Sequence, residues 1–538
     1  MNRQGRVLIV DDLDKWRKEL VSILQREGFA TASADTATLA LERLQTDIYH
    51  VVVLDIRLVD SDLSNTDGID LLRELGKRGL SEATKVIILS AHGTAEQMRE
   101  AFKDYKVVDF LSKDRFSKQG FLESINHAFS KEAPINLDLQ IHWQQVKGPE
   151  QVVHNLELGG TRLKRNPELQ NQIALELEDL LCRLFDKAHS VIVQPLTSGQ
   201  SGTGVLRAQP FYSHGGGRTV IVKFGDFQLI DHESQQFREC VQPYISGGRA
   251  TNVLAKRRTP HLGGLIYSLL GAEREQWEDF GHYYTHSSTQ RITNVLDHLF
   301  LDTCGAWYAN LGRLQPFDLT SDYQAMLGFT QENLDHALLN LQKSVKGRQK
   351  LIFTSLSKER AFSNPLQEIE ELSFMRPTYT CITHGDFNHQ NILVDSSGYS
   401  WLIDFQATGP GHVLRDIAQL DSVIRYVLLP TSDATLDERL QMEETLCSIS
   451  FFSQVEQLNT QLETTNKALA KTYAVVVHLR TLARKLIAQN LSDDISEYYI
   501  ALFYFAINTL RFYAIPSCQR EHALLCASLL ADRLELNK

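Results

Sequence analysis

The sequence predicts a chain of the α/β class, with a doubly wound parallel sheet first and a two-lobed α+β region after it. Short apolar strands alternate with amphipathic helical patterns over residues 1–130, as in a parallel sheet that is covered by helices on both faces. Glycine-rich turns and β-branched runs follow up to residue 270, and helical periodicity dominates residues 271–538. At about 100–200 residues per domain, the 538 residues are enough for several domains.

The composition is that of a globular protein, with 43% hydrophobic and 22% charged residues. The net charge of −11 argues against broad binding to nucleic acids or anionic membranes. No helix-turn-helix pattern is legible either, so we expect no direct DNA binding. The seven cysteines are scattered without C-x-x-C spacing, which predicts reduced thiols. The apolar run 498–507 is too short to span a bilayer, and we find no signal-peptide pattern. We therefore expect a buried helix, no membrane span and a cytoplasmic location.

Polar residues stand at or just after the carboxyl ends of four expected strands, at 6–10, 51–54, 85–89 and 107–111. Ligands of open parallel sheets bind at those ends. The polar residues are Asp11, Asp12, Asp55, Ser90 and Lys113. Because three carboxylates in one pocket repel one another unless a divalent cation binds them, we expect Asp11, Asp12 and Asp55 to bind Mg²⁺. Asp55 can then act as a nucleophile toward a phosphoryl group, with Ser90 and Lys113 contacting the product's oxygens.

In their order and spacing over residues 5–130, these residues resemble the response-regulator receiver domain, which has a flavodoxin-like fold. The resemblance implies that Asp55 is the phosphoacceptor, that an upstream histidine kinase or phosphotransfer protein is the donor, and that Ser90, Phe110 and Lys113 are switch residues. The sequence departs from the family in two places. Asp114 replaces the usual proline after the lysine, and the loop 56–68 is long and acidic, with Asp60, Asp62 and Asp67. A nucleotide-binding or purely structural flavodoxin-like domain is the alternative.

Residues 131–165 are expected to be a connector, which is polar and interrupted by Pro134 and Pro149. We assign it no function. A lobe with a leading helix is expected at residues 166–270. Asn166 is the predicted N-cap of that helix and Pro167 lies in its first turn, and the apolar spacing from Leu169 onward is helical.

A hairpin is predicted at residues 391–403, where two β-rich runs flank the turn residues 395–398. It would present Asp386 and Asn391 before its first strand and Asp404 at the end of its second. Phosphoryl transfer from a nucleotide requires one carboxylate for the acceptor hydroxyl, and a carboxylate and an amide for magnesium. We therefore expect Asp386 to be the catalytic base, and Asn391 and Asp404 to be metal ligands.

A glycine-rich turn precedes these residues by almost two hundred positions and contains Gly199, Gly202 and Gly204. Glycines let backbone N–H groups approach phosphates without a Cβ in the way. The strand 218–224 follows with Lys223, and a helix is expected at 231–244.

The whole order, from this turn through Lys223 to H-G-D at 384–386 and I-D-F at 403–405, resembles the aminoglycoside phosphotransferase and choline-kinase-like branch of the kinase fold. The resemblance covers about residues 191–416. It implies Mg²⁺ and ATP, or another nucleoside triphosphate, as cofactors, with Lys223 at the α and β phosphates. Glu233, or else Glu239, would orient that lysine. It also implies a helical lobe with the catalytic loop at 271–538, in which Asp416 supports the loop near His384.

The helical lobe shows no legible acceptor pocket. Its aromatic cluster of Trp277, Phe280, Tyr283 and Tyr284 is more typical of a core than of a cage for a ring. A long helical stretch is expected at 455–489, whose apolar spacing fits a coiled-coil seam or, more simply, a helical hairpin within the lobe. The basic run 478–485 is expected to face solvent.

Together these patterns predict a two-component-type response regulator with a kinase-like phosphotransferase as output. It would bind Mg-ATP, transfer phosphate to an unknown hydroxyl acceptor or partner protein, and be regulated by phosphorylation of Asp55. One alternative is a catalytically quiet, kinase-like scaffold for nucleotide sensing or protein assembly in a bacterial signalling or conflict system. Another is a receiver that serves only for dimerisation, and a homodimer is therefore possible.

Overall fold

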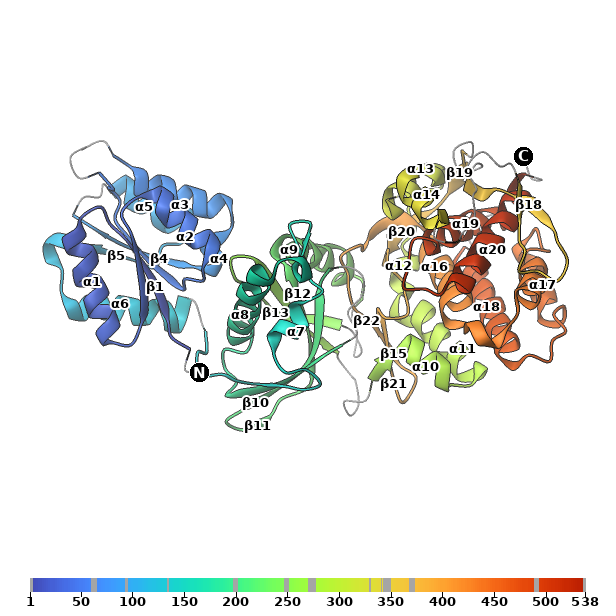
Figure 1. The fold of residues 1–538 in the computed structure, drawn as a ribbon, viewed down its shortest axis with the longest axis horizontal. Coiled ribbons are helices and arrows are strands. Elements are labelled where there is room, and N and C mark those ends of the chain that lie inside the picture. The colour runs from blue at the N-terminus through green and yellow to red at the C-terminus, as the bar shows by residue number, and fades with distance from the viewer. Residues whose placement is uncertain are drawn as a thin grey trace. The chain divides into compact units, whose positions relative to one another are not determined.

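The computed structural model describes residues 3–59, 65–91, 95–132, 135–196, 202–245, 251–269, 277–328, 330–339, 341, 350–366, 373–487 and 493–535. The chain divides into two compact units (Figure 1). Unit 1 comprises Met1–Ser234 and Asn252–Ser268, and unit 2 comprises Gln235–Thr251 and Leu269–Lys538. The two units therefore alternate along the sequence.

The first sheet of unit 1 is parallel and has the strand order β2-β1-β3-β4-β5. Its strands are β1 (Arg6–Val10), β2 (Ala30–Ala34), β3 (Val51–Leu54), β4 (Lys85–Ser90) and β5 (Asp109–Ser112). The expected strands are confirmed. Strand β2 escaped the sequence pattern because it is made of alanine, serine and threonine, and only Ala34 is fully buried.

Helices cover both faces of this sheet, as a doubly wound fold requires. They are α1 (Asp14–Arg26), α2 (Ala37–Thr46), α3 (Asp67–Lys77), α4 (Leu80–Ala83), α5 (Ala95–Asp104) and α6 (Lys118–His127), followed by the π-helical turn η2 (Ala128–Glu132). Side chains of a strand alternate between its faces, so Leu8 and Val10 join one core while Val7 and Ile9 join the other. Two buried faces explain why these strands are apolar throughout.

The second sheet of unit 1 has the order β13-β14-β12-β10-β9-β6, with β11 paired to β10. Its strands are β6 (Gln140–Trp143), β9 (Ser190–Pro195), β10 (Gly204–Tyr212), β11 (Gly215–Gly216), β12 (Val220–Asp226), β13 (Thr251–Arg258) and β14 (Leu262–Leu269). Strand β6 comes from the expected connector and pairs in parallel with β9. The short elements α7 (Pro149–Val153), β7 (Glu157–Leu158) and β8 (Thr161–Arg162) follow it.

Helix α8 (Pro167–Leu184) packs on this second sheet. The Asn166 side chain accepts a hydrogen bond from the N–H of Leu169 at 3.2 Å and Pro167 opens the first turn, as predicted. Leu177, Leu180 and Leu184 share a core with strand residues. Helix α9 (Phe227–Gln236) follows β12 and continues into the π-helical η4 (Phe237–Val241).

Unit 2 is mainly helical around a small sheet of order β15-β21-β22. Strands β21 (Ile392–Asp395) and β22 (Ser400–Leu402) form the predicted antiparallel hairpin, which β15 (Trp277–Asp279) extends. The helices are α10 (Phe280–His286), α11 (Thr289–Asp297), α12 (Gly305–Ala309), α13 (Leu319–Leu327), α14 (Gln331–Leu339), α16 (Arg415–Val423), α17 (Leu436–Leu446), α18 (Lys467–Leu486), α19 (Ser496–Thr509) and α20 (Ser517–Glu535), with π-helical turns η5 (His298–Thr303) and η6 (Ile424–Leu428). The remaining strands are β16 (Gln315–Asp318), β17 (Lys350–Ile352), β18 (Ala361–Ser363), β19 (Met375–Thr378), β20 (Thr380–Thr383) and β23 (Gly409–His412).

The helical stretch expected at 455–489 is interrupted. A 3-10 segment, η8 (Phe452–Thr460), precedes α18, whose first turn is capped by the side chain of Asn466. The Tyr473 hydroxyl donates to the carbonyl of Leu458 at 2.6 Å, so η8 folds back on α18. The coiled-coil alternative is wrong and the hairpin interpretation is confirmed.

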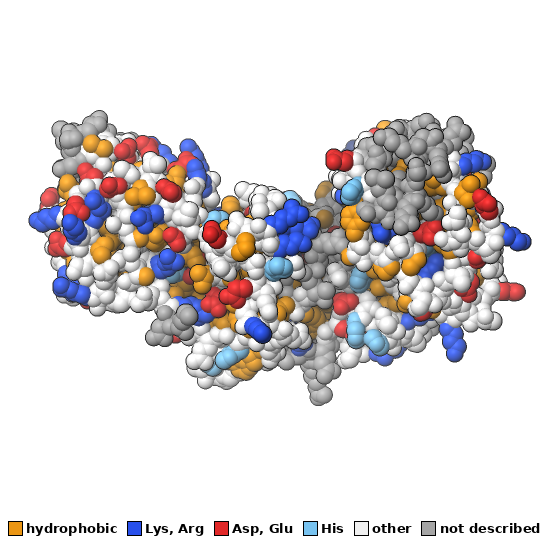
Figure 2. All heavy atoms as spheres, viewed as in Figure 1, with side chains coloured by type: hydrophobic (Ala, Val, Ile, Leu, Met, Phe, Trp, Pro, Cys, Tyr) orange, Lys and Arg blue, Asp and Glu red, His pale blue; other side chains and the backbone are white. Residues whose placement is uncertain are grey.

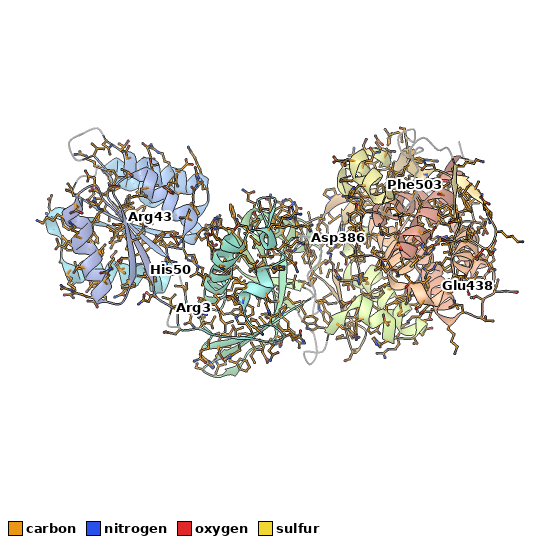
Figure 3. The ribbon with its side chains drawn as sticks, in the orientation of Figure 1. Arg3, Arg43, His50, Asp386, Glu438 and Phe503 are labelled. Carbon is orange, nitrogen blue, oxygen red and sulfur yellow. The ribbon has the colours of Figure 1, made fainter. Side chains whose placement is uncertain are left out.

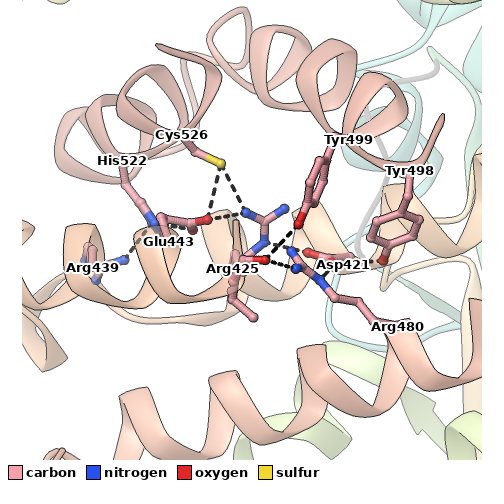
Figure 4. A network of polar contacts seen from close by, with 10 residues as sticks. Asp421, Arg425, Arg439, Glu443, Arg480, Tyr498, Tyr499, His522 and Cys526 are labelled. Carbon is pink, nitrogen blue, oxygen red and sulfur yellow. Dashed lines mark hydrogen bonds and ion pairs between the residues drawn. The ribbon is translucent and has the colours of Figure 1, made fainter. Parts of the chain in front are cut away.

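The basic run 478–485 faces solvent at Arg484 and Lys485, as predicted, but not at Arg480. Arg480 of the basic run is fully buried, where it lies with Asp421, Tyr498 and Tyr499 in a network of polar contacts between helices (Figure 4). The aromatic residues Phe280, Tyr283 and Tyr284 and the whole run 498–507 are buried, as predicted.

The seven cysteines, all within the described residues, are free thiols, and Cys518 is the exposed one. Among the helices that the structure describes, none combines the length and apolar character needed to cross a membrane. Acidic and basic side chains are interspersed on the face drawn in Figure 2.

Candidate functional site

The carboxyl edge of the first sheet gathers the predicted acidic residues. Carboxylate oxygens of Asp11, Asp12 and Asp55 lie within 4.8 Å of one another. Asp11 and Asp12 follow β1 and Asp55 follows β3, so adjacent parallel strands deliver them to one place. Ser90, the last residue of β4, donates its hydroxyl to Asp55 Oδ1 at 2.6 Å. Lys113, after β5, places Nζ 2.6 Å from Asp11 Oδ2 and also pairs with Asp55.

Burial and charge act against each other in this pocket. Burial raises the pKa of Asp11 above its ordinary value, although the Lys113 ammonium acts in the opposite direction. Burial alone would lower the pKa of Lys113, but its contacts with Asp11 and Asp55 raise it. Three converging carboxylates are a donor set that suits Mg²⁺, a hard cation that prefers oxygen ligands. The pocket therefore fits Mg²⁺, the metal that the sequence predicts for these three carboxylates.

The loop after Asp55 returns very close to Asp55 at Gly68. A Cβ on Gly68 would lie 2.2 Å from the carbonyl oxygen of Asp55, so this position requires glycine. The side chain of Asn65 accepts hydrogen bonds from the N–H groups of Leu58 and Asp67. Asp67 begins α3, whereas Asp60 and Asp62 lie outside the described residues. The switch candidate Phe110 is half-buried on β5 and packs against the core on one face of the sheet.

A buried ion pair joins β12 to α9. Lys223 Nζ lies 2.6 Å from Glu233 Oε2, and both side chains are 1% exposed. The hydroxyl of Tyr267 donates to Glu233 Oε1 at 2.6 Å. Glu239, the other candidate, is exposed and accepts from the Gln235 side chain. The structure thus brings Lys223 and Glu233 together, as the sequence predicts.

The glycine-rich turn is described only in part. Gly202 has a φ of +72°, which favours glycine. A Cβ on Gly204, the first residue of β10, would lie 2.3 Å from the Phe224 ring. Gly199 lies outside the described residues.

In unit 2, the loop before β21 holds Asp386 through amide groups. Asn391 Nδ2 donates to Asp386 Oδ2 at 3.0 Å and to its backbone carbonyl at 2.9 Å. Gln419 Nε2 donates to Oδ1 at 3.0 Å, and Asn388 Nδ2 makes longer contacts of 3.3 and 3.4 Å with the two oxygens. Gln419 Oε1 in turn accepts from the N–H of Phe387 at 2.7 Å. Asp386 is therefore held as a hydrogen-bond acceptor.

Asn388 and Gln419 were missed by the sequence analysis. Asn388 lies two residues after Asp386, between the H-G-D motif and the hairpin. This closeness in the sequence was the available signal that Asn388 contacts Asp386. Gln419 lies on α16 and is 33 residues from Asp386. It is three residues after Asp416, and that spacing places both residues on one face of a helix.

Asp416 of α16 supports the same loop through hydrogen bonds to its backbone. Its carboxylate accepts from the backbone N–H of His384 at 2.8 Å and of Gly385 at 3.0 Å, and from the Tyr308 hydroxyl at 2.9 Å. Gly385 has a φ of +79°, and a Cβ there would lie 2.2 Å from the carbonyl of Ala407. The expectation that Asp416 braces the loop near His384 agrees with these contacts.

Asp404 follows the hairpin with a φ of +68°, one of the few described non-glycine residues in the left-handed region. Such backbone strain is concentrated at functional sites. The carboxylate of Asp404 and the amide oxygen of Asn391 are both oxygen donors of the kind that Mg²⁺ prefers. Asp386, Asn391 and Asp404 belong to unit 2, whereas Lys223 and Glu233 belong to unit 1.

Comparisons with known proteins identify the first domain directly. A family model described as "Response regulator receiver domain" matches residues 7–126. A curated relative from Koribacter versatilis, "Protein-glutamate methylesterase/protein-glutamine glutaminase 2", is 32% identical over 124 residues, which are 22% of this chain and 32% of the relative. "Regulatory protein AtoC" of Escherichia coli is 28% identical over 209 residues, covering 38% of this chain and 39% of the relative. The chain thus spans 32% of the length of the first relative and 39% of the length of the second.

Solved structures match the same part of the chain. A receiver domain protein from Methanospirillum hungatei JF-1 is 23% identical and covers 23% of this chain and 92% of that chain, with a TM-score of 0.21. The NtrX structure from Brucella abortus in complex with ADP is 28% identical and covers 24% of this chain and 26% of that chain, also with a TM-score of 0.21.

The rest of the chain matches a family other than the phosphotransferases that its motifs resemble. The model described as "Ternary complex associated domain 9" matches residues 188–350 and 353–511, well over half of the 538 residues. This match spans the Lys223–Glu233 pair of unit 1 and the loop of Asp386 in unit 2. The chain therefore belongs to the Ternary complex associated domain 9 family and begins with a response-regulator receiver domain.

Proposed function

We propose that this protein is a response regulator whose region beyond the receiver binds a magnesium nucleotide and transfers the terminal phosphoryl group to a hydroxyl acceptor. The observation that carries the proposal is the loop around Asp386. Its carboxylate is held by amide donors from Asn391 and Gln419. The hairpin that follows the loop leads to a second carboxylate, Asp404, whose backbone has a strained positive φ. The buried Lys223–Glu233 pair supports the nucleotide-binding part of the proposal, because buried charged groups are often kept for function.

In the proposed reaction Asp386 accepts a hydrogen bond from the acceptor hydroxyl and takes its proton as that oxygen attacks the terminal phosphorus. The bond between phosphorus and the bridging oxygen breaks, and the nucleoside diphosphate leaves. Lys223 donates to phosphate oxygens while Glu233 orients it. Asn391 and Asp404 would hold Mg²⁺, whose positive charge offsets that of the phosphates.

The receiver is proposed to control this reaction. Asp55 would take a phosphoryl group from a phosphohistidine of an upstream histidine kinase or phosphotransfer protein. The bond between phosphorus and the histidine nitrogen breaks, and the imidazole leaves as the Asp55 oxygen attacks. The hydroxyl of Ser90 and the ammonium of Lys113 already contact the Asp55 carboxylate. The same two groups would bind the oxygens of the new phosphoryl group.

Magnesium-dependent ATP turnover by the purified chain tests the proposal, with and without beryllofluoride as a mimic of the phosphoryl group on Asp55. We expect turnover that beryllofluoride changes and that Asp386→Ala abolishes. Asp433→Ala, which alters an exposed aspartate of the same unit, is the matched control and should behave as the unaltered chain. Turnover that persists in Asp386→Ala would contradict the proposal.

A second candidate function is a nucleotide-sensing or protein-assembly scaffold. The description of the matched family, a domain associated with a ternary complex, favours assembly. Sedimentation of the chain with and without ATP separates the two candidates. A scaffold binds the nucleotide and changes its assembly state, for example to a homodimer, without hydrolysing or transferring phosphate.

A further inference from the structure

Within unit 1, the receiver contacts the following lobe through the amino-terminal edge of its sheet. Arg3, just before β1, donates to the carbonyl of Leu139 at 2.7 Å and pairs with Glu178 of α8 at 3.1 Å. Arg183 of α8 donates to the carbonyl of Ala83, two residues before β4, at 2.6 Å. Figure 3 labels Arg3 and His50 at this end of the receiver.

His50, directly before β3, lies at the centre of this edge. Its Nδ1 accepts the backbone N–H of Arg6 at 2.9 Å, so its proton is on Nε2, which lies 2.7 Å from Asp179 Oδ1 of α8. Asp179 Oδ2 accepts from Arg183 Nε at 2.6 Å. The side chains of His50, Asp179 and Arg183 are 3%, 10% and 5% exposed. Burial would raise the pKa of Asp179, but Arg183 and His50 hold it below its ordinary value.

Three of the parallel strands that begin at this edge lead to Asp11, Asp55 and Ser90 of the acidic pocket. Strand β1 leads to Asp11, β3 leads to Asp55, and β4 ends in Ser90. Strand β3 is fully buried and is paired on both sides, with β1 and with β4. A short strand held in this way moves with little internal deformation. A change at Asp55 and a change at His50 are therefore mechanically linked.

Helix α8 connects this edge to the strand of Lys223. A Cβ on Gly264 of β14 would lie 3.0 Å from the side chains of Leu180 and Leu184. Helix α8 therefore packs directly on β14, the neighbour of the Lys223 strand β12. The next residue of β14, Leu265, is the register partner of Lys223 in β12. A displacement of α8 would therefore shift the pair of strands, β12 and β14, that positions Lys223.

We propose that the amino-terminal edge of the receiver sheet, centred on the contact of His50 with Asp179 and Arg183, transmits the phosphorylation state of Asp55 to α8. The inference rests on the proposed role of Asp55 as phosphoacceptor and not on phosphoryl transfer by unit 2. A buried carboxylate that loses its partners is strongly destabilised, and the made and the broken contact are the two states that this inference assigns. A switch requires such a two-state element that both sites bias.

Coupling between two sites is reciprocal, which gives the test. The affinity of the full chain for beryllofluoride and Mg²⁺ is measured by calorimetry for the unaltered chain and for His50→Gln. We expect His50→Gln to change that affinity by about fivefold or more, since allosteric coupling starts at this size. The control is Gln172→Ala, which removes a contact of α8 with the carbonyl of Thr46 at the end of α2 and should leave the affinity unchanged.

A second readout and a second variant complete the experiment. Hydrogen exchange of residues 167–184 should change on addition of beryllofluoride to the unaltered chain. Asp179→Asn alters the same contact from the other side and replaces His50→Gln if that variant does not fold. Equal affinity in all folded variants, together with unchanged exchange in α8, would overturn the inference and leave the role of Asp55 intact. Absence of beryllofluoride binding to the unaltered chain would overturn both.

Discussion

The side-chain amide of Gln419 attaches the loop of Asp386 to α16 through two hydrogen bonds. It accepts from the backbone of Phe387 and donates to the carboxylate of Asp386. Because its oxygen must face the Phe387 N–H, its NH₂ group must face Asp386. The orientation of the proposed base is thus set by a residue that need not touch the substrate.

Gln419→Leu removes both hydrogen bonds at similar side-chain size. We expect the rate of phosphoryl transfer to fall by about 10- to 100-fold, since small misplacement of a catalytic group costs that much. Nucleotide affinity should change little, because the Lys223–Glu233 pair belongs to unit 1. Steady-state kinetics separates the two quantities. Gln441→Leu, at an exposed glutamine of α17, is the control, and an equal loss in both variants would contradict the assigned positioning role.

Gly385 and Gly398 give a matched pair of glycines with φ of +79° and +85°. An alanine at either position meets the left-handed backbone penalty of about 1–2 kcal/mol. At Gly385 the new Cβ would also meet the Ala407 carbonyl at 2.2 Å, whereas at Gly398 its nearest neighbour is at 3.6 Å. We expect Gly385→Ala to lower the free energy of unfolding by at least about 2 kcal/mol more than Gly398→Ala, as urea denaturation would measure. Equal losses would show that the loop relaxes around the added atom.

For single residues, the sequence predicts contacts within a short motif. It does not predict contacts with residues that are distant in the chain. The spacing of Asp386 and Asn391 predicts that their side chains lie together, and they are hydrogen-bonded. The brace from Asp416 was also foreseen. Gln419 was not, because helical periodicity reports which face of α16 is apolar and not which loop a polar residue of that face will meet.

At the scale of elements, the helices of unit 2 are joined by a network of buried charges (Figure 4). Arg425 Nη1 lies 2.6 Å from Glu443 of α17, and Arg425 Nε lies 2.5 Å from Asp421 of α16. His522 of α20 contacts the other oxygen of Glu443 at 2.8 Å. All these side chains are fully buried. Burial would raise the pKa of Glu443, but Arg425 and His522 hold it at about 2.

Removing the charge of Glu443 leaves Arg425 without one of its two carboxylates. We expect Glu443→Gln to lower the free energy of unfolding at pH 7 by about 3–5 kcal/mol, the usual cost of breaking a buried ion pair from one side. Glu444→Gln, at the neighbouring exposed glutamate that pairs with Arg360, should cost less than about 1 kcal/mol. Urea denaturation of both variants tests this, and a small effect at Glu443 would contradict the network's role.

The same network makes stability fall on acidification. The folded pKa of Glu443 is below its ordinary 4.5, so its contribution is complete above pH 4.5 and is lost as the pH falls toward 2. Burial lowers the pKa of His522 in the folded chain below its ordinary 6.5. Below pH 6.5 the unfolded chain therefore binds this proton more readily than the folded chain, which also favours unfolding. Glu443→Gln should flatten the dependence between pH 4.5 and 2.

Most elements are predictable from the sequence, because apolar periodicity, the length of each apolar run and the turn residues at its ends together separate strands from helices. The parallel strands of the receiver, the hairpin at 391–403 and the buried run 498–507 all followed from it. The position of Arg480 did not. A charged residue within a basic helical run is usually exposed to solvent. Arg480 is buried because it pairs with the buried Asp421, which lies on another helix.

At the scale of the whole molecule, unit 2 takes a segment from the middle of unit 1's sequence. Phe237 packs against Phe405 with ring centroids 5.5 Å apart, and Trp307 Nε1 donates to the carbonyl of Cys240 at 2.8 Å. Thr251 Oγ1 donates to the carbonyl of Leu402 at 2.6 Å. By sequence alone, residues 235–251 group with the lobe at 166–270, because contacts between distant segments leave no local pattern.

The fragment 269–538 therefore lacks part of its own core, whereas 235–538 retains it. We expect the shorter fragment to melt at a lower temperature and to be cut faster by protease, because removal of Phe237 and its neighbours opens a cavity beside Phe405. Thermal melting and limited proteolysis of both fragments test this. Equal melting temperatures would show that residues 235–251 contribute no stability to unit 2.

The alternation of the two units also sets an order of events during synthesis. Thr251 is synthesised 151 residues before its partner Leu402, which at about 5–20 residues per second is a delay on the order of ten seconds. During that time the apolar side chains of the segment have no core to enter. A nascent chain of this protein thus offers a chaperone a defined target, and slowing translation after residue 251 should lengthen its exposure.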